Sequence, residues 1–141
     1  MIQRKQTLWL LLASAAAFCT LRFPFYGGRR LNATANLPNE YFSAQNNLLL
    51  LILTAGVGLL AFISIFLYKN RKLQLRLTVI SVIVSLLNLV LYFIETKKFV
   101  PEQSSYNITS IIALVIPVFL FIAARGIRKD EKLVKSLDRL R

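Results

Sequence analysis

The sequence of 141 residues contains no histidine, one cysteine and only six acidic residues. Without histidine, the chain cannot build a Ser-His or Cys-His catalytic pair or a His-ligated metal site. The lone Cys19 cannot close an internal disulfide, so cysteine usage does not indicate a redox compartment. We therefore expect no catalytic residues, no metal and no cofactor, and a protein that is not an enzyme.

Apolar residues, in contrast, are abundant and unevenly distributed. They make up 56% of the chain, above the roughly 45–50% that is usual in soluble domains. They gather in four blocks, at residues 7–23, 48–68, 77–94 and 108–124. A membrane-spanning helix needs about 17–25 predominantly apolar residues, and each block reaches that length. The sequence predicts an all-α fold: an integral membrane four-helix bundle over residues 1–125, followed by a short basic amphipathic C-terminal helix at 126–141.

The basic residues indicate an orientation for these spans. The chain has 18 Lys and Arg residues and a net charge of +12. Thirteen of them fall at the N-terminus, in the link 69–76 and in the tail, whereas five fall on the opposite side, at the end of the first block and in the other two loops. Lys and Arg accumulate on the cytoplasmic side of short loops, so both termini are expected in the cytoplasm. No acidic residue lies inside a block, which argues against an ion-coupled pump.

The first block allows a second interpretation. Its basic start, apolar stretch and Ala15-Ala16-Ala17 are also typical of a cleaved secretory signal. A lipoprotein site at Cys19 fits poorly, because the bulky Phe18 precedes it. The apolar run continues to Phe23, longer than a signal needs, which favours a retained helix. The distribution of loop charge would be the same after cleavage and does not separate the two interpretations.

A polar stripe runs along the third block. It consists of Thr78, Ser81, Ser85, Asn88 and Tyr92, whose spacing of three and four residues places them on one helix face. An unsatisfied Asn in hydrocarbon is costly, so this face should point into the bundle as a helix-packing seam. The alternative is a polar path for a small molecule, in a channel or transporter that works as a homo-oligomer.

The second block contains a glycine motif. Gly56-Val57-Gly58-Leu59-Leu60-Ala61 matches the G-x-G-x-x-A pattern of dinucleotide sites. Such a site needs a short preceding strand and an acidic residue about 20 positions later. Here the apolar run continues to Tyr68, and the basic Arg76 stands near the acidic position. We expect these glycines to permit close contact between helices instead.

The segment 126–141 is basic, and Leu133, Val134, Leu137 and Leu140 follow helical spacing. A helix of this kind can lie on anionic lipid headgroups or can bind a cytoplasmic protein. The absence of aromatic residues disfavours direct nucleic-acid binding. The candidate cytoplasmic interaction residues, from the 69–76 link and the tail, are Lys69, Arg71, Lys72, Arg128, Lys129, Lys132, Lys135 and Arg139.

The two ends of the chain resemble those of a known family. The beginning reads Met1-Ile2-Gln3-Arg4-Lys5-Gln6-Thr7, and the end reads Ile127-Arg128-Lys129-Asp130-Glu131-Lys132-Leu133-Val134, then Asp138-Arg139-Leu140-Arg141. Both are similar to the ends of a family of small four-span bacterial inner-membrane proteins, catalogued as domain of unknown function 4293. The resemblance implies a retained first helix and the bacterial cytoplasmic membrane, and it brings no activity. We therefore expect a non-enzymatic structural or adaptor protein that presents its basic tail to a protein partner or anionic lipid.

Overall fold

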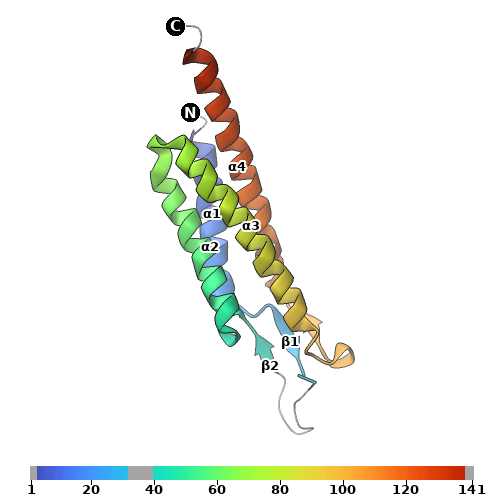
Figure 1. The fold of residues 1–141 in the computed structure, drawn as a ribbon. Helices are drawn as coiled ribbons and strands as arrows, with labels where there is room; N and C mark the ends of the chain where they lie inside the picture. Colours follow the sequence, from blue (N-terminus) through green and yellow to red (C-terminus); the bar gives the residue numbers. More distant parts are fainter. Residues whose placement is uncertain (1–2, 32–39, 139–141) are drawn as a thin grey trace.

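Four long helices form the body of the molecule. The computed structural model describes residues 3–31 and 40–138. The helices are α1 (Gln3–Arg22), α2 (Leu48–Phe66), α3 (Arg71–Thr96) and α4 (Ser110–Asp138). α1 packs against α2 and α4, and α3 packs against the same two helices, so neighbours follow chain order around the bundle (Figure 1). The predicted all-α class is confirmed.

Three stretches in the described residues are long and apolar enough to cross a membrane, which suits a multi-pass membrane protein. They are Leu48–Lys69, which includes the 3₁₀ turn η2 (Leu67–Lys69), Arg71–Thr96 and Ser110–Ser136. α1 does not join them, because Lys5, Gln6 and Arg22 lower the hydropathy of its two ends. The fourth span stays a prediction.

Helix α3 has its polar and apolar faces arranged opposite to those of a soluble helix. Its buried residues are all polar: Gln74, Thr78, Ser81, Ser85, Asn88, Tyr92 and Thr96. Its exposed residues include Ile83, Leu87 and Val90, each more than half exposed. Water would penalise such an exposed apolar face, and monomeric soluble proteins rarely show one of this extent. Lipid tails can solvate this apolar face. The buried face of α3 is therefore the one that packs against the other helices.

The largest core cluster lies where α1 meets α2 and α4. Small residues of α1, Ala13 and Ala17, are completely buried there. They face Val57 of α2 and Leu120 of α4, among others. Small side chains let helix backbones approach closely, which is the main source of packing energy between helices in lipid. α1 is thus a central packing element although it is the least apolar helix.

A small three-stranded sheet closes the end of the bundle opposite the termini. It is built from β1 (Tyr26–Gly28), β2 (Glu40–Phe42) and β3 (Ser105–Tyr106), in the order β2-β1-β3 with both pairings antiparallel. Aromatic rings hold it to the helices: Phe25 stacks on Tyr92 of α3 with ring centroids 4.5 Å apart. At Gly28 a Cβ atom would lie 2.5 Å from the Cα of Ser104, so this close approach requires glycine. The sequence analysis did not predict the sheet.

The connections at the other end are shorter than expected. Only Asn70 separates η2 from α3, so most of the expected link 69–76 belongs to helices. α4 likewise continues for 29 residues, through Pro117 and past the expected boundary at Arg125. Ile127 and Asp130 are buried in the bundle, with exposed fractions of 1% and 6%. The tail is therefore the last part of α4 and not a separate helix, and the packed bundle extends to about residue 130.

Candidate functional site

The polar stripe of α3 lies inside the bundle. All five of its residues are at most 6% exposed. Three of its hydroxyls donate to carbonyls of their own helix: Thr78 to Gln74 at 2.8 Å, Ser81 to Leu77 at 2.9 Å and Ser85 to Val82 at 2.8 Å. These groups are satisfied locally, so they offer small, neutral side chains for close packing.

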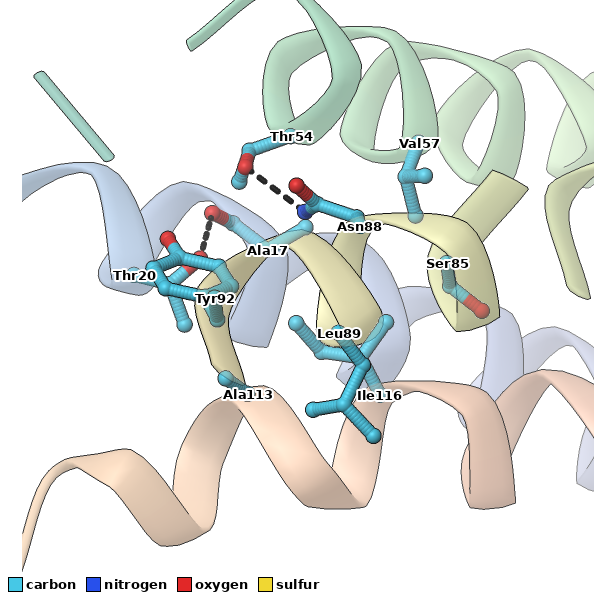
Figure 2. Close-up of a pocket in the computed structure, with 10 residues that line it drawn as sticks. All are labelled: Ala17, Thr20, Thr54, Val57, Ser85, Asn88, Leu89, Tyr92, Ala113 and Ile116. Carbon is cyan, nitrogen blue, oxygen red and sulfur yellow. Dashed lines mark hydrogen bonds between the residues drawn. The ribbon is translucent and has the colours of Figure 1, made fainter. Parts of the chain in front are cut away.

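Asn88 makes the contact of the stripe that crosses between helices (Figure 2). Its Nδ2 donates to Oγ1 of Thr54 on α2 at 2.8 Å. Its Oδ1 is buried without a hydrogen-bond partner in the described residues. The Tyr92 hydroxyl, beside Thr20 and Thr54, also lacks hydrogen-bond geometry to either. The cavity between these groups measures about 10 Å³, room for about one water.

The two glycines of α2 have different surroundings. A Cβ atom on Gly58 would lie 3.2 Å from Cζ of Phe18 and 3.4 Å from Cβ of Ala17, both on α1. The Ser14 hydroxyl of α1 also donates to the Gly58 carbonyl at 3.1 Å. A Cβ atom on Gly56 would meet nothing within 4 Å. The expected close helix contact therefore occurs at Gly58, and the expectation was wrong for Gly56, which faces outward.

A second polar cluster joins the beginning and the end of the helical bundle. Gln6 Nε2 on α1 donates to Oδ2 of Asp130 on α4 at 2.5 Å, and both side chains are buried. Arg71 of α3 donates to the Asp130 carbonyl at 3.4 Å. Gly126 lets the Gln6 side chain approach α4 closely, because a Cβ atom at position 126 would lie only 3.0 Å from Cγ of Gln6. We call the pair Gln6 and Asp130 the terminal clamp. The sequence analysis missed it.

The terminal clamp lies within the two end motifs on which the family resemblance rests. A family model described as Domain of unknown function (DUF4293) matches residues 2–140. The chain belongs to this family. No curated protein and no solved structure matches it. The DUF4293 resemblance stated from the ends of the sequence is confirmed, and the structure brings one residue from each end motif into direct contact.

The predicted interaction residues of this DUF4293 chain gather at the end of the bundle that carries both termini (Figure 1). Lys69 and Lys72 are exposed and Arg71 is half-buried, beside the turn between α2 and α3. On α4, the predicted residues Arg128, Lys129, Lys132 and Lys135 are all exposed. Arg139 lies outside the described residues. The structure thus brings the link and the tail together at one end.

Beyond Asp130, α4 leaves the other three helices. In Figure 1 its end extends past them. We call residues 131–138 the arm. Lys132 to Ser136 are all exposed, and the apolar Leu133 and Val134 are 46% and 39% exposed. Glu131 and Lys135 form an ion pair at 2.9 Å along the arm. The arm therefore presents basic and apolar side chains together.

Within residues 3–31 and 40–138, the structure contains no group of three or more His, Cys, Asp or Glu side chains that could hold a metal ion. The expectation of a protein without catalytic residues or cofactor stays a prediction.

Proposed function

We propose that this DUF4293 protein is a four-span protein of the bacterial cytoplasmic membrane that acts as a non-enzymatic adaptor. Both termini lie in the cytoplasm, and the arm binds a cytoplasmic protein. The observation that carries the proposal is the arm itself: a helix continuous with the bundle, projecting from it with exposed Leu133 and several lysines.

The continuity of α4 favours a protein partner over a lipid surface for the arm. A helix that lies on a membrane runs in the interface plane with its apolar face in the headgroup region. The arm instead continues the direction of a candidate spanning helix without a break. Its eight residues extend about 12 Å at 1.5 Å per residue. A partner with an acidic rim and an apolar groove for Leu133 and Val134 would complement it.

The charge of the two ends supports the orientation. Arg71 and Lys72 begin α3, and Arg128 and Lys129 belong to the last part of α4, which contacts Arg71 through Asp130. These two segments lie at the end of the bundle that carries the termini (Figure 1), where the sequence concentrates its basic residues. The opposite end carries fewer cations, and two of them are engaged with carboxylates: Lys98 with Glu95 at 2.7 Å and Arg30 with Glu40 at 3.6 Å. The positive-inside rule then favours the termini in the cytoplasm.

A channel or transporter along the polar face of α3 has less support. The cavity beside Asn88 has a volume of about 10 Å³, which admits about one water. Three hydroxyls of the stripe are already bonded to their own helix. The stripe of a single chain is therefore better suited to packing than to the passage of a solute.

The test is co-purification of the tagged full-length protein and three variants in mild detergent, read by mass spectrometry. The first variant ends at residue 131, which retains Ile127 and Asp130 in the bundle. The second replaces Lys132 and Lys135 by Gln. The third, a matched control, replaces the exposed Arg22 and Lys97 at the opposite end by Gln.

We expect a partner that is retained by the full chain and the Arg22/Lys97 control but lost from the two arm variants. A synthetic peptide of residues 126–141 should compete with the purified partner. The adaptor role is refuted if all four forms retain the same proteins, or if the control loses the partner as completely as the arm variants do.

A further inference from the structure

A groove between α3 and α4 lies on the outer surface of the bundle. It has a volume of about 260 Å³. Its apolar walls come from Leu75, Val79 and Ile83 of α3 and from Phe121 of α4, among others. Arg125 and Arg128 of α4 also line it. The groove therefore combines a long apolar wall with two cations.

The groove has the dimensions of one lipid leaflet. Leu75 and Ile83 are eight residues apart on α3, which corresponds to about 12 Å along the helix. Half of a typical hydrocarbon core is about 15 Å. The arginines lie toward the end of α4 that carries the terminal clamp, the end assigned to the cytoplasm. An acyl chain in the groove would thus run from the arginines toward the middle of the bilayer.

The two arginines have the charge and geometry to bind a phosphate. They are three residues apart, on the same face of α4, and both are exposed. Neither forms an ion pair in the described part of the chain, because Glu131 is paired with Lys135 and Asp130 is turned inward to Gln6. Guanidinium groups bind phosphate oxygens in a bidentate manner, more strongly than an ammonium group does.

A second groove between the same helices provides an internal comparison. It lies nearer the sheet, has a volume of about 200 Å³ and is lined by Phe25, Phe93, Tyr106 and Leu114, among others. None of its lining residues is charged. An acyl chain could fill either groove, but only the first has cations where a headgroup would lie. Basic pockets between spanning helices on the cytoplasmic side are suited to anionic phospholipids.

We propose that the groove between α3 and α4 is a specific site for an anionic phospholipid of the cytoplasmic leaflet. One acyl chain packs against Val79 and Phe121, and the phosphate is held by Arg125 and Arg128. The site uses the membrane orientation of the proposed function but does not depend on the adaptor role of the arm.

The test is native mass spectrometry of the purified full-length protein, titrated with phosphatidylglycerol or phosphatidylcholine in detergent. The Arg125→Gln/Arg128→Gln variant removes the headgroup contacts. The Lys132→Gln/Lys135→Gln variant removes the same charge from the arm. Val79→Trp fills the groove, and Leu114→Trp fills the second groove as its control.

We expect phosphatidylglycerol to bind at least tenfold more tightly than phosphatidylcholine. The double arginine variant and Val79→Trp should each lower that affinity about tenfold or more, whereas the double lysine variant and Leu114→Trp should change it less than twofold. Equal loss in the arginine and lysine variants would indicate general attraction to anionic lipid and overturn the site. Binding that survives Val79→Trp, or that does not distinguish the two lipids, would also overturn it.

The same variants separate this site from the proposed function. The double lysine variant should lose the protein partner and keep the lipid. Val79→Trp, which leaves every predicted interaction residue in place, should show the reverse. Failure of one proposal therefore leaves the other standing.

Discussion

Substitution of Gly58 by a larger residue should separate α1 from α2, whereas the same substitution at Gly56 should not. The two glycines lie in the same helix, two residues apart, so any effect on helix propensity is nearly equal. They differ in what a side chain would meet: Phe18 and Ala17 of α1 at Gly58, and nothing within 4 Å at Gly56. Comparison of the two substitutions therefore separates the effect of the helix–helix contact from the effect on helix propensity.

The expected magnitudes follow from these contacts. Gly→Leu in a helix interior gains somewhat less than about 1 kcal/mol from propensity at either position. At Gly58, overpacking costs about 1–3 kcal/mol. Loss of the Ser14 hydrogen bond to the Gly58 carbonyl costs about 0.6 kcal/mol, the average for interhelical bonds in membranes. Gly58→Leu should thus be less stable than Gly56→Leu by roughly 2–4 kcal/mol.

The assay is reversible unfolding in mixed micelles by titration with dodecyl sulfate, followed by far-ultraviolet circular dichroism. A third variant, Gly58→Ala, should fall between the two, because the nearest atom belongs to the partly exposed Phe18, which can move. Addition of Phe18→Ala should then recover stability in the Gly58→Ala background. Equal unfolding free energies for Gly56→Leu and Gly58→Leu would refute the reasoning, since the close approach would then contribute nothing.

Two further predictions concern polar contacts inside the bundle. A double-mutant cycle with Asn88→Leu and Thr54→Val should give a coupling free energy of about 0.6–1.7 kcal/mol in the same unfolding assay, the range for interhelical bonds in lipid; a coupling near zero would mean that the 2.8 Å bond does not stabilise the fold. Asp130→Ala should cost about 1–3 kcal/mol, because it leaves the buried Gln6 amide without its acceptor. The adjacent Glu131→Ala breaks an ion pair with Lys135 that water screens, so it should cost clearly less than Asp130→Ala; equal losses would argue against the clamp.

The sequence predicted the parts of the molecule that have a regular period. Four apolar blocks became four helices, and the spacing of three and four residues located the stripe from Thr78 to Tyr92, which the structure buries. The sheet could not be found in this way. Its strands have two or three residues each, too few to show an alternating pattern, and they pair across long stretches of chain.

The end of α4 was misjudged for a different physical reason. The change from apolar to charged residues at Arg125, with Gly126 next to it, resembles the end of a helix. In the structure, Gly126 is needed for the approach of Gln6, and the helix continues beside it. The clamp itself joins residues 124 positions apart, in segments whose charge suggested only solvent-exposed flanks. Local patterns carry no information about such a pair.

The terminal clamp also constrains the timing of assembly. Of the four helices, α1 is synthesised before the other three and is the least apolar, yet Asp130, the hydrogen-bond partner of its Gln6 side chain, lies 124 residues later in the chain. At about 5–20 residues per second, roughly 6–25 seconds pass before that partner exists. During this interval the amide of Gln6, which is buried in the complete bundle, lacks its Asp130 acceptor. A quality-control protease would then encounter an incomplete bundle. We therefore expect the protein to become more resistant to degradation once α4 is complete, and variants of Asp130 should prolong the period of vulnerability.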